Sequence, residues 1–367
     1  MAAQRHILPV PPFTHEEFDD QRKPRVLISG GGIGGLTLAI LLHRANIPFL
    51  VLERAKEIKP LGSAMTMGSS VGPLFKQLGI WDEFVRRSKT FNSMPMYDED
   101  LKLLHCMDWN GWLQKGVGYY EHIISRPQLY DLLFNSVPRE RILLSKRILS
   151  CTQNRDKVII ECSDNSSYFG DILVGADGAY SAVRQHLYKQ LKADKKLPTS
   201  SSDDVSLPFS CVCLVGQTVP LEPEEFPHLK EELSQTNSVL GVSTMCTWLT
   251  FTTKQNTVCW MVIHFLDKES SKRNDSFRNS EWGPEDAEAL AREVRPFKVP
   301  GGKDGKVRTL GEYVDKTPRQ QMSKVMLEGT SWTTARIGIG DRHRQGDTSS
   351  TRFPTSSLKP WQELSVY

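Results

Sequence analysis

The stretch Arg25-Val-Leu-Ile-Ser-Gly-Gly-Gly-Ile-Gly-Gly35, with Glu53 after it, decides the fold of this chain. The apolar run behind Arg25 is typical of a buried parallel strand. Gly30, Gly32 and Gly35 then fill the three glycine positions of a G-x-G-x-x-G turn. In such a turn the first glycine allows a tight bend, the second lets the backbone approach a pyrophosphate, and the third lets helix pack on strand.

The segments that follow the turn have the period of a helix and then of a second strand. We expect a helix from residue 33 to about 45, a strand over 49–52, and an acidic side chain, Glu53, at its end. The helix N-terminus offers unbonded N–H groups and a positive dipole to a phosphate, while the acid suits a ribose. Because two anions repel, Glu53 disfavours a phosphorylated ribose. The sequence therefore predicts a site for FAD or NAD; the alternative is a tight structural turn.

Composition excludes several classes of protein. The chain has 367 residues with a formal charge of only +3, so no nucleic-acid partner is expected. No stretch reaches the roughly 18 apolar residues of a membrane span, and residues 1–24 lack the apolar core of a signal peptide. We expect a flexible arm there and a cytoplasmic location, with peripheral membrane association left open. The seven cysteines are scattered, which indicates buried thiols rather than a metal site.

Beyond residue 205 the apolar period changes to two, which predicts an antiparallel sheet. Long strands are expected over residues 209–219, 239–253 and 258–266. Alternation on the last strand sets Cys259 and Met261 on one face and Trp260 and Val262 on the other. One face would be core, and the second would either cover an apolar substrate pocket or be packed as well.

Three further motifs make a family resemblance specific. Gly175-Ala-Asp-Gly-Ala-Tyr-Ser-Ala-Val-Arg184 resembles the DG motif of the class A flavoprotein monooxygenases, the para-hydroxybenzoate hydroxylase-like family. Arg336-Ile-Gly-Ile-Gly-Asp341 resembles the start of its GD motif, and residues 124–133 resemble its arginine-bearing helix start. The three occur in the family's order, and the likeness is greatest to fungal secondary-metabolism and salicylate-hydroxylase-like members.

The resemblance implies an α/β fold: a Rossmann-like, glutathione-reductase-type FAD-binding domain with an interleaved antiparallel substrate sheet. The implied organisation is an arm over 1–24, the FAD-binding domain over 25–190, the substrate domain over 205–310, a return to the FAD domain over 311–341, and a disordered tail over 342–367.

The resemblance also implies roles for individual residues. The turn glycines would hold the FAD pyrophosphate, Glu53 the adenosine ribose, and Arg126 the chain between pyrophosphate and ribityl. Asp177 would organise FAD and a transient NAD(P)H site, and Asp341 would bind a ribityl hydroxyl. Gly34, Arg54, Gly178 and Gly340 complete the predicted cofactor site. Two plainer interpretations stay open: Arg126 as a surface ion-pair partner, and the segment Asp177–Gly178 as an ordinary turn.

In this family reduced flavin reacts with O2 to a C4a-hydroperoxide, which hydroxylates or epoxidises an apolar aromatic or polycyclic small molecule. The cofactor carries the hard step, which explains why no acid–base constellation stands out. No catalytic residue is assigned; Tyr119, Tyr120, His122 and His264 are the candidates for a base. The sequence does not give an oligomeric state.

After Asp341 the chain departs from the family pattern, since Gly346 is isolated and no apolar helix follows. A shifted reading frame, a retained intron or a true truncation would each explain this. The alternatives to a monooxygenase are thus a catalytically impaired relative that binds FAD, another FAD oxidoreductase such as a reductase, a non-catalytic binding protein, and, with least support, an NAD dehydrogenase.

Overall fold

The computed structural model describes the chain over eleven stretches: residues 23–58, 62–108, 116, 118–154, 157–178, 181–197, 209–241, 243–270, 291–301, 305–318 and 322–327. Most of the predicted N-terminal arm, the GD-motif residues Gly340 and Asp341, and the predicted tail lie outside the described residues.

A four-stranded parallel sheet carries the glycine turn, in the order β12-β1-β2-β8. Its strands are β1 (Val26–Ser29), β2 (Phe49–Leu52), β8 (Ile142–Leu143) and β12 (Ile172–Gly175). The register sets Val26 of β1 beside Phe49 of β2 on one side and Ile172 of β12 on the other. The second predicted strand thus has the predicted bounds, and the carboxyl ends of β1, β2 and β12 meet at one edge.

Layers cover both faces of this sheet. Helix α1 (Ile33–Arg44) buries Leu36, Ala39 and Ile40 against the face that carries Ile28 and Val51. The opposite face meets an antiparallel sheet of β9 (Ile148–Asn154), β10 (Lys157–Cys162) and β11 (Ser167–Gly170). Parallel strands covered on both sides are apolar throughout rather than alternating, which is the pattern of β1 and β2.

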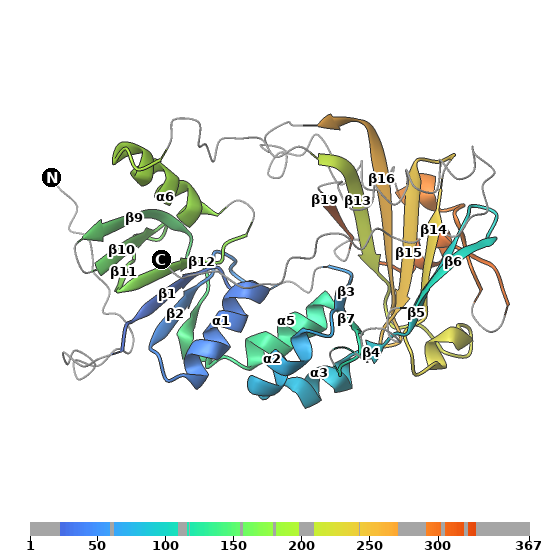
Figure 1. Ribbon diagram of the computed structural model, residues 1–367, viewed down its shortest axis with the longest axis horizontal. Helices are drawn as coiled ribbons and strands as arrows, with labels where there is room; N and C mark the ends of the chain where they lie inside the picture. The colour runs from blue at the N-terminus through green and yellow to red at the C-terminus, as the bar shows by residue number, and fades with distance from the viewer. Residues whose placement is uncertain are drawn as a thin grey trace. The chain divides into compact units, whose positions relative to one another are not determined.

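Several helices, a short turn and a small sheet complete this part of the chain. They are α2 (Val71–Gln77), α3 (Trp81–Arg87), α5 (Arg126–Asn135), α6 (Ala182–Ala193), the 3-10 turn η2 (Arg139–Arg141), and a three-stranded sheet of β3 (Ala64–Met67), β7 (His122–Ser125) and β4 (Lys89–Thr90). Helix α5 buries Leu129, Leu132 and Leu133 in the same core as α1. Figure 1 shows α5 running beside α1.

A seven-stranded sheet forms the other main structure, in the order β19-β13-β16-β15-β14-β5-β6 (Figure 1). Its strands are β5 (Ser93–Tyr97), β6 (Leu103–Asp108), β13 (Phe209–Gln217), β14 (Thr236–Leu240), β15 (Cys246–Thr252), β16 (Val258–Ser270) and β19 (Ser323–Leu327). Two of them, β5 and β6, come from the segment between β2 and α5.

The strand predicted over residues 239–253 is wrong as a single element. The chain reverses between Leu240 and Cys246, and the two arms pair as β14 and β15. Met245 takes a positive φ of 54°, which a regular strand does not allow. The turn, not the apolar pattern, therefore decided the strand count.

Strand β16 has buried side chains on both of its faces. Val258, Trp260 and Val262 pack in a core with α8 (Leu310–Val314) and residues 291–294, while Cys259 and Ile263 on the other face are also buried. Short elements lie beside that core: the 3-10 turn η3 (Pro227–Lys230) and the strands β17 (Lys298–Val299) and β18 (Arg308–Thr309).

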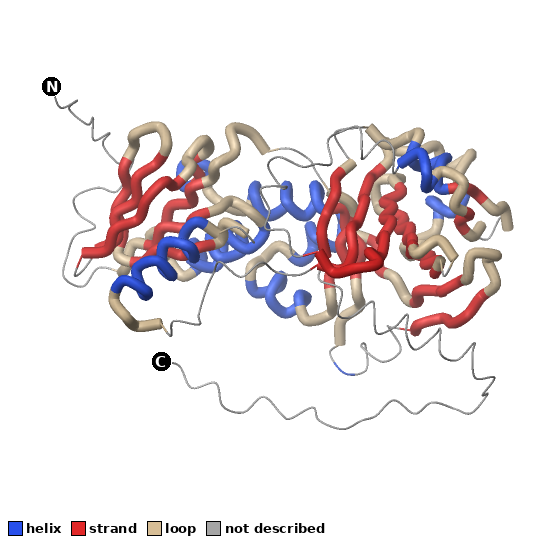
Figure 2. Tube along the Cα trace, turned by 90° about the horizontal axis from the view of Figure 1, so that it is seen from above, coloured by secondary structure: helices blue, strands red, loops and turns tan. Residues whose placement is uncertain are grey.

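Figure 2 separates the helices, in blue, from the strands, in red. No helix in the described part of the chain combines the length and the apolar character needed to cross a membrane. All seven cysteines lie in the described ranges, and none is joined in a disulfide.

Candidate functional site

The glycine turn after β1 is built so tightly that two of its positions accept only glycine. Gly30 has a φ of 105°, and a Cβ there would lie 2.4 Å from the carbonyl oxygen of Ala176. A Cβ on Gly35 would lie 2.0 Å from the carbonyl oxygen of Gly30. These glycines let α1 pack on the turn and let the turn pack on the end of β12.

The outer side of the same turn is open. A Cβ on Gly32 or Gly34 would meet no atom within 4 Å. Gly32 caps α1 without a side-chain hydrogen bond, no acidic residue lies in the first turn, and the helical bonding starts with Leu36 N–H to Gly32 C=O. The N–H groups of residues 33–35 thus have no partner within the helix. Open space beside two glycines, together with N–H groups that have no partner within the helix, fits the diphosphate of a dinucleotide.

Glu53 lies at the end of β2, where the sequence predicts a ribose-binding acid. Its Oε2 accepts a hydrogen bond of 2.7 Å from Gly31 N–H, and its Oε1 accepts one of 2.8 Å from Ala55 N–H. These bonds fix the carboxylate beside the turn, and each oxygen keeps capacity for a further donor. The neighbouring Arg54 is exposed.

Arg126 is the first residue of α5, and its backbone N–H donates to the carbonyl of Ser63 over 2.9 Å. Its side chain lies along Gly62, where a Cβ would come within 2.7 Å of Arg126 Cδ. Gly62 has a φ of 118°, so this glycine lets the loop approach the arginine. The preceding Ser125 has a buried hydroxyl oxygen with no hydrogen-bond partner among the described residues.

Asp177 brings the DG segment to the glycine turn, since its Cα would lie 2.9 Å from a Cβ on Gly30. Its Oδ2 accepts a 2.7 Å hydrogen bond from Ala182 N–H at the start of α6. Its Oδ1 is buried and has no hydrogen-bond partner within the described ranges. Gly178 follows with a φ of 83°. A buried carboxylate oxygen without a partner beside the glycine turn is suited to accept a hydrogen bond from a hydroxyl group of a bound cofactor.

Sequence reasoning missed Tyr130 of α5, whose hydroxyl donates to the carbonyl of Gly31 over 2.7 Å. Its position four residues after Arg126 was the available signal, because residues at i and i+4 share a helix face. Gly62 and Ser63 were also missed; they lie in an irregular loop with no periodic pattern.

The four candidate bases have separate surroundings. His122 is buried against Trp81 and Phe84, and burial lowers its pKa to about 4. His264 lies 3.4 Å, from Nδ1 to Sγ, from Cys246 on the face of β16 that carries Trp260.

The tyrosine candidates lie just before β7. The Tyr119 ring contacts Trp81, and Lys76 lies over it; Tyr120 is exposed. The partners named here for Tyr119, His122 and His264 all lie outside the glycine turn.

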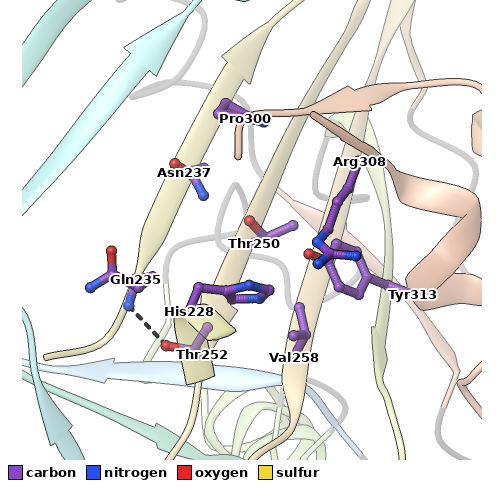
Figure 3. Close-up of a pocket in the computed structure, with 9 residues that line it drawn as sticks. All are labelled: His228, Gln235, Asn237, Thr250, Thr252, Val258, Pro300, Arg308 and Tyr313. Carbon is purple, nitrogen blue, oxygen red and sulfur yellow. Dashed lines mark hydrogen bonds between the residues drawn. The ribbon is translucent and has the colours of Figure 1, made fainter. Parts of the chain in front are cut away.

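A small pocket opens on the face of the seven-stranded sheet that carries Val258 (Figure 3). Arg308, which lines it, donates to Glu312 and to the carbonyl of Glu225. On the opposite face of that sheet the Cys259 side chain meets the side chain of Ser63, whose hydroxyl also donates to Gly216 C=O over 3.1 Å. The pocket is therefore separate from the glycine turn and Arg126.

Comparisons with known proteins identify the family of the chain. A family model described as an FAD binding domain matches residues 23–219. The chain is 28% identical over 258 residues to the FAD-dependent monooxygenase nvfK of Aspergillus novofumigatus, covering 70% of this chain and 53% of that protein. It is 27% identical to the FAD-dependent monooxygenase andE of Emericella variicolor, covering 87% of this chain and 64% of that protein.

Solved structures show the same fold. HpxO of Klebsiella pneumoniae, in complex with FAD and uric acid, aligns with a TM-score of 0.59 at 18% identity, covering 83% of this chain and 67% of that chain. FqzB aligns with a TM-score of 0.59 at 17% identity, covering 83% of this chain and 66% of that chain. The chain spans about half the length of the first curated relatives that it matches.

The matched range contains the glycine turn, Glu53, Arg126 and Asp177. The cofactor of this chain is FAD. On this evidence the chain belongs to the class A FAD-dependent monooxygenase family.

Proposed function

We propose that this chain uses FAD, NAD(P)H and O2 to hydroxylate or epoxidise an apolar aromatic or polycyclic small molecule. The observation that carries the proposal is the short path from cofactor site to sheet: Arg126 N–H donates to Ser63 C=O, and the Ser63 hydroxyl donates to Gly216 C=O. A ligand on that sheet face would lie next to the loop that packs on Arg126. When bound, FAD would supply the redox chemistry by which one atom of O2 enters the substrate and the other is reduced to water with electrons from NAD(P)H.

Under this proposal, the groups gathered around the glycine turn bind different parts of the cofactor. The N–H groups at the start of α1 hold the diphosphate, Glu53 accepts from the adenosine ribose, and Asp177 Oδ1 accepts from a cofactor hydroxyl. Arg126 lies along the chain between diphosphate and ribityl. Asp341, outside the described residues, keeps its role at the ribityl chain by resemblance alone, as Gly340 keeps its place in the cofactor site.

The substrate would lie on the sheet face that Ser63 meets. The register sets Met96, Ser238, Leu249 and Met261 in a row across β5, β14, β15 and β16. Paired residues of neighbouring strands share a face, and Met96 and Met261 are half-buried. Methionine side chains are flexible and polarizable, so they adapt to apolar ligands of irregular shape. This row favours an apolar substrate.

The test begins with the absorption spectrum of the purified chain after gel filtration. Flavin bands, with FAD released on denaturation, support the cofactor assignment. The chain is then incubated with NADPH, 18O2 and a panel of fused-ring phenols, and products are analysed by mass spectrometry. One 18O atom in a product supports the proposal. A product formed equally well without O2 would make the chain a reductase, and a folded chain that takes up no added FAD would overturn both.

A further inference from the structure

Two side chains from distant parts of the sequence hold Gly31 from opposite ends. The N–H of Gly31 donates to Glu53 Oε2 over 2.7 Å, and its C=O accepts from the hydroxyl of Tyr130 over 2.7 Å. Gly31 itself is buried. It lies between Gly30, which takes a positive φ, and Gly32, which faces open space. The backbone N–H and C=O of Gly31 are thus both hydrogen-bonded within the protein itself.

The bond from Tyr130 has a consequence for the next N–H along the chain. A peptide unit is planar and trans, so the C=O of Gly31 and the N–H of Gly32 point in opposite directions. With its C=O held toward α5, this unit directs the Gly32 N–H away from α5. Glycines on both sides make rotation of such a unit cheap. A rotated unit would turn a carbonyl oxygen, rather than an N–H, toward a bound diphosphate.

Tyr130 is itself fixed by its neighbours. Its ring stacks on Phe134, with 5.9 Å between centroids and 24° between planes. The Arg139 guanidinium lies 4.1 Å from the centroid of Phe134. Burial and, to a smaller extent, the charge of Glu53 raise the pKa of Tyr130 to about 12. The hydroxyl therefore stays a hydrogen-bond donor throughout the physiological pH range.

We propose that Tyr130 is a positioning residue for the cofactor: by holding Gly31 C=O, it orients the Gly32 N–H toward the FAD diphosphate. Tyr130 acts through the backbone and not by touching the diphosphate. The inference extends FAD binding at the glycine turn to a residue on a different helix, and it rests on that binding.

The test compares Tyr130→Phe with Tyr97→Phe in the protein stripped of FAD. Tyr97 is a tyrosine of β5 that packs in the core around Trp260, so it controls for loss of a hydroxyl elsewhere. FAD is titrated while its fluorescence is followed, and ADP, which carries only the adenosine and diphosphate, is titrated by calorimetry. Loss of one hydrogen bond predicts an FAD Kd raised about 5- to 10-fold in Tyr130→Phe. We expect the Kd for ADP to rise by the same factor. In Tyr97→Phe we expect both Kd values to equal those of the wild type.

Thermal unfolding of the stripped proteins separates positioning from general support. A raised Kd for both ligands, with unfolding midpoints of the two variants within a few degrees of each other, supports the proposal. An unchanged Kd in Tyr130→Phe would overturn it while leaving FAD binding by the wild type intact. Phe134→Leu keeps the hydroxyl but removes the stacking partner. Its Kd should lie between those of wild type and Tyr130→Phe, and a Kd equal to wild type would also count against the proposal.

Discussion

The hydroxyl of Ser63 donates to the backbone carbonyl of Gly216 over 3.1 Å, and this bond joins the loop after β2 to the seven-stranded sheet. Both ends of the contact are buried or tightly packed: Ser63 is 7% exposed, and a Cβ on Gly216 would lie 2.4 Å from the ring of Trp260. A further contact of the loop, from Arg126 N–H to Ser63 C=O, connects it to α5. One residue thus links the candidate cofactor site and the candidate substrate face.

Ser63→Ala should lower the free energy of unfolding by about 1 kcal/mol, the usual net value of a buried hydrogen bond. Urea denaturation followed by tryptophan fluorescence measures it. Ser150→Ala is the matched control, because the Ser150 hydroxyl bonds Glu161 on the separate β9–β10 surface and is less buried. Equal losses in the two variants would show that the Ser63 bond has no special part in joining loop to sheet.

Gly32→Ala should separate cofactor binding from folding. Its Cβ would occupy open space in the protein, and its φ of −76° suits any residue, so the stability of the FAD-free protein should stay within about 0.5 kcal/mol of wild type. The same methyl group would occupy the space of the diphosphate, and we expect the FAD Kd to rise about 100-fold, close to 3 kcal/mol. FAD titration and urea denaturation measure the two quantities.

Gly34→Ala is the control for that substitution. Gly34 also faces open space, but it is a helical position of α1 beyond the second glycine of the turn. A much smaller rise in Kd is expected there. If Gly32→Ala binds FAD as tightly as wild type, the diphosphate does not approach this glycine.

Asp177→Asn should weaken FAD binding, while Ser181→Ala should not. Both side chains accept a hydrogen bond from a backbone N–H group at the start of α6: Asp177 from Ala182, and Ser181 from Arg184. Each variant should therefore lose about 1 kcal/mol of stability. Only Asp177 has a second, buried oxygen without a partner in the described ranges, so its FAD Kd should rise about tenfold. Equal Kd values for the two variants would leave Asp177 with a capping role alone.

Stability should fall on acidification because of His122. Its pKa is lowered by burial from 6.5 to about 4, so between these values the unfolded chain binds more protons than the folded one. Stability then rises with pH across this window and falls as the pH drops through it. The contribution at pH 5 should be about 2 kcal/mol lower than at pH 8.

Urea denaturation of wild type and His122→Phe at several pH values measures this contribution. The change in slope against pH, not the absolute stability, is the readout, because the bond of 2.9 Å to the Ser88 hydroxyl is also lost. His105→Asn, at an exposed position on β6, is the control. A wild-type slope that survives in His122→Phe would assign the acid sensitivity to other groups.

The sequence by itself determined the dinucleotide site. Strand β1, helix α1, strand β2 and Glu53 follow one another within 30 residues, and each is specified by local physics: apolar runs, helical period and glycines at positions without room for a Cβ. The strand over residues 239–253 was wrong because a turn with Met245 at positive φ carries no such local signal.

Only the tertiary structure decided how distant segments meet at that site. The bond from Tyr130 to Gly31 spans 99 positions, and that from Ser63 to Gly216 spans 153. Neither pairing is encoded in a periodic pattern, because a hydrogen bond between irregular loops depends on where the packed layers bring their atoms. The sequence thus specified the groups that a diphosphate needs, while packing of α5 and of the seven-stranded sheet decided how those groups are held and what lies beside them.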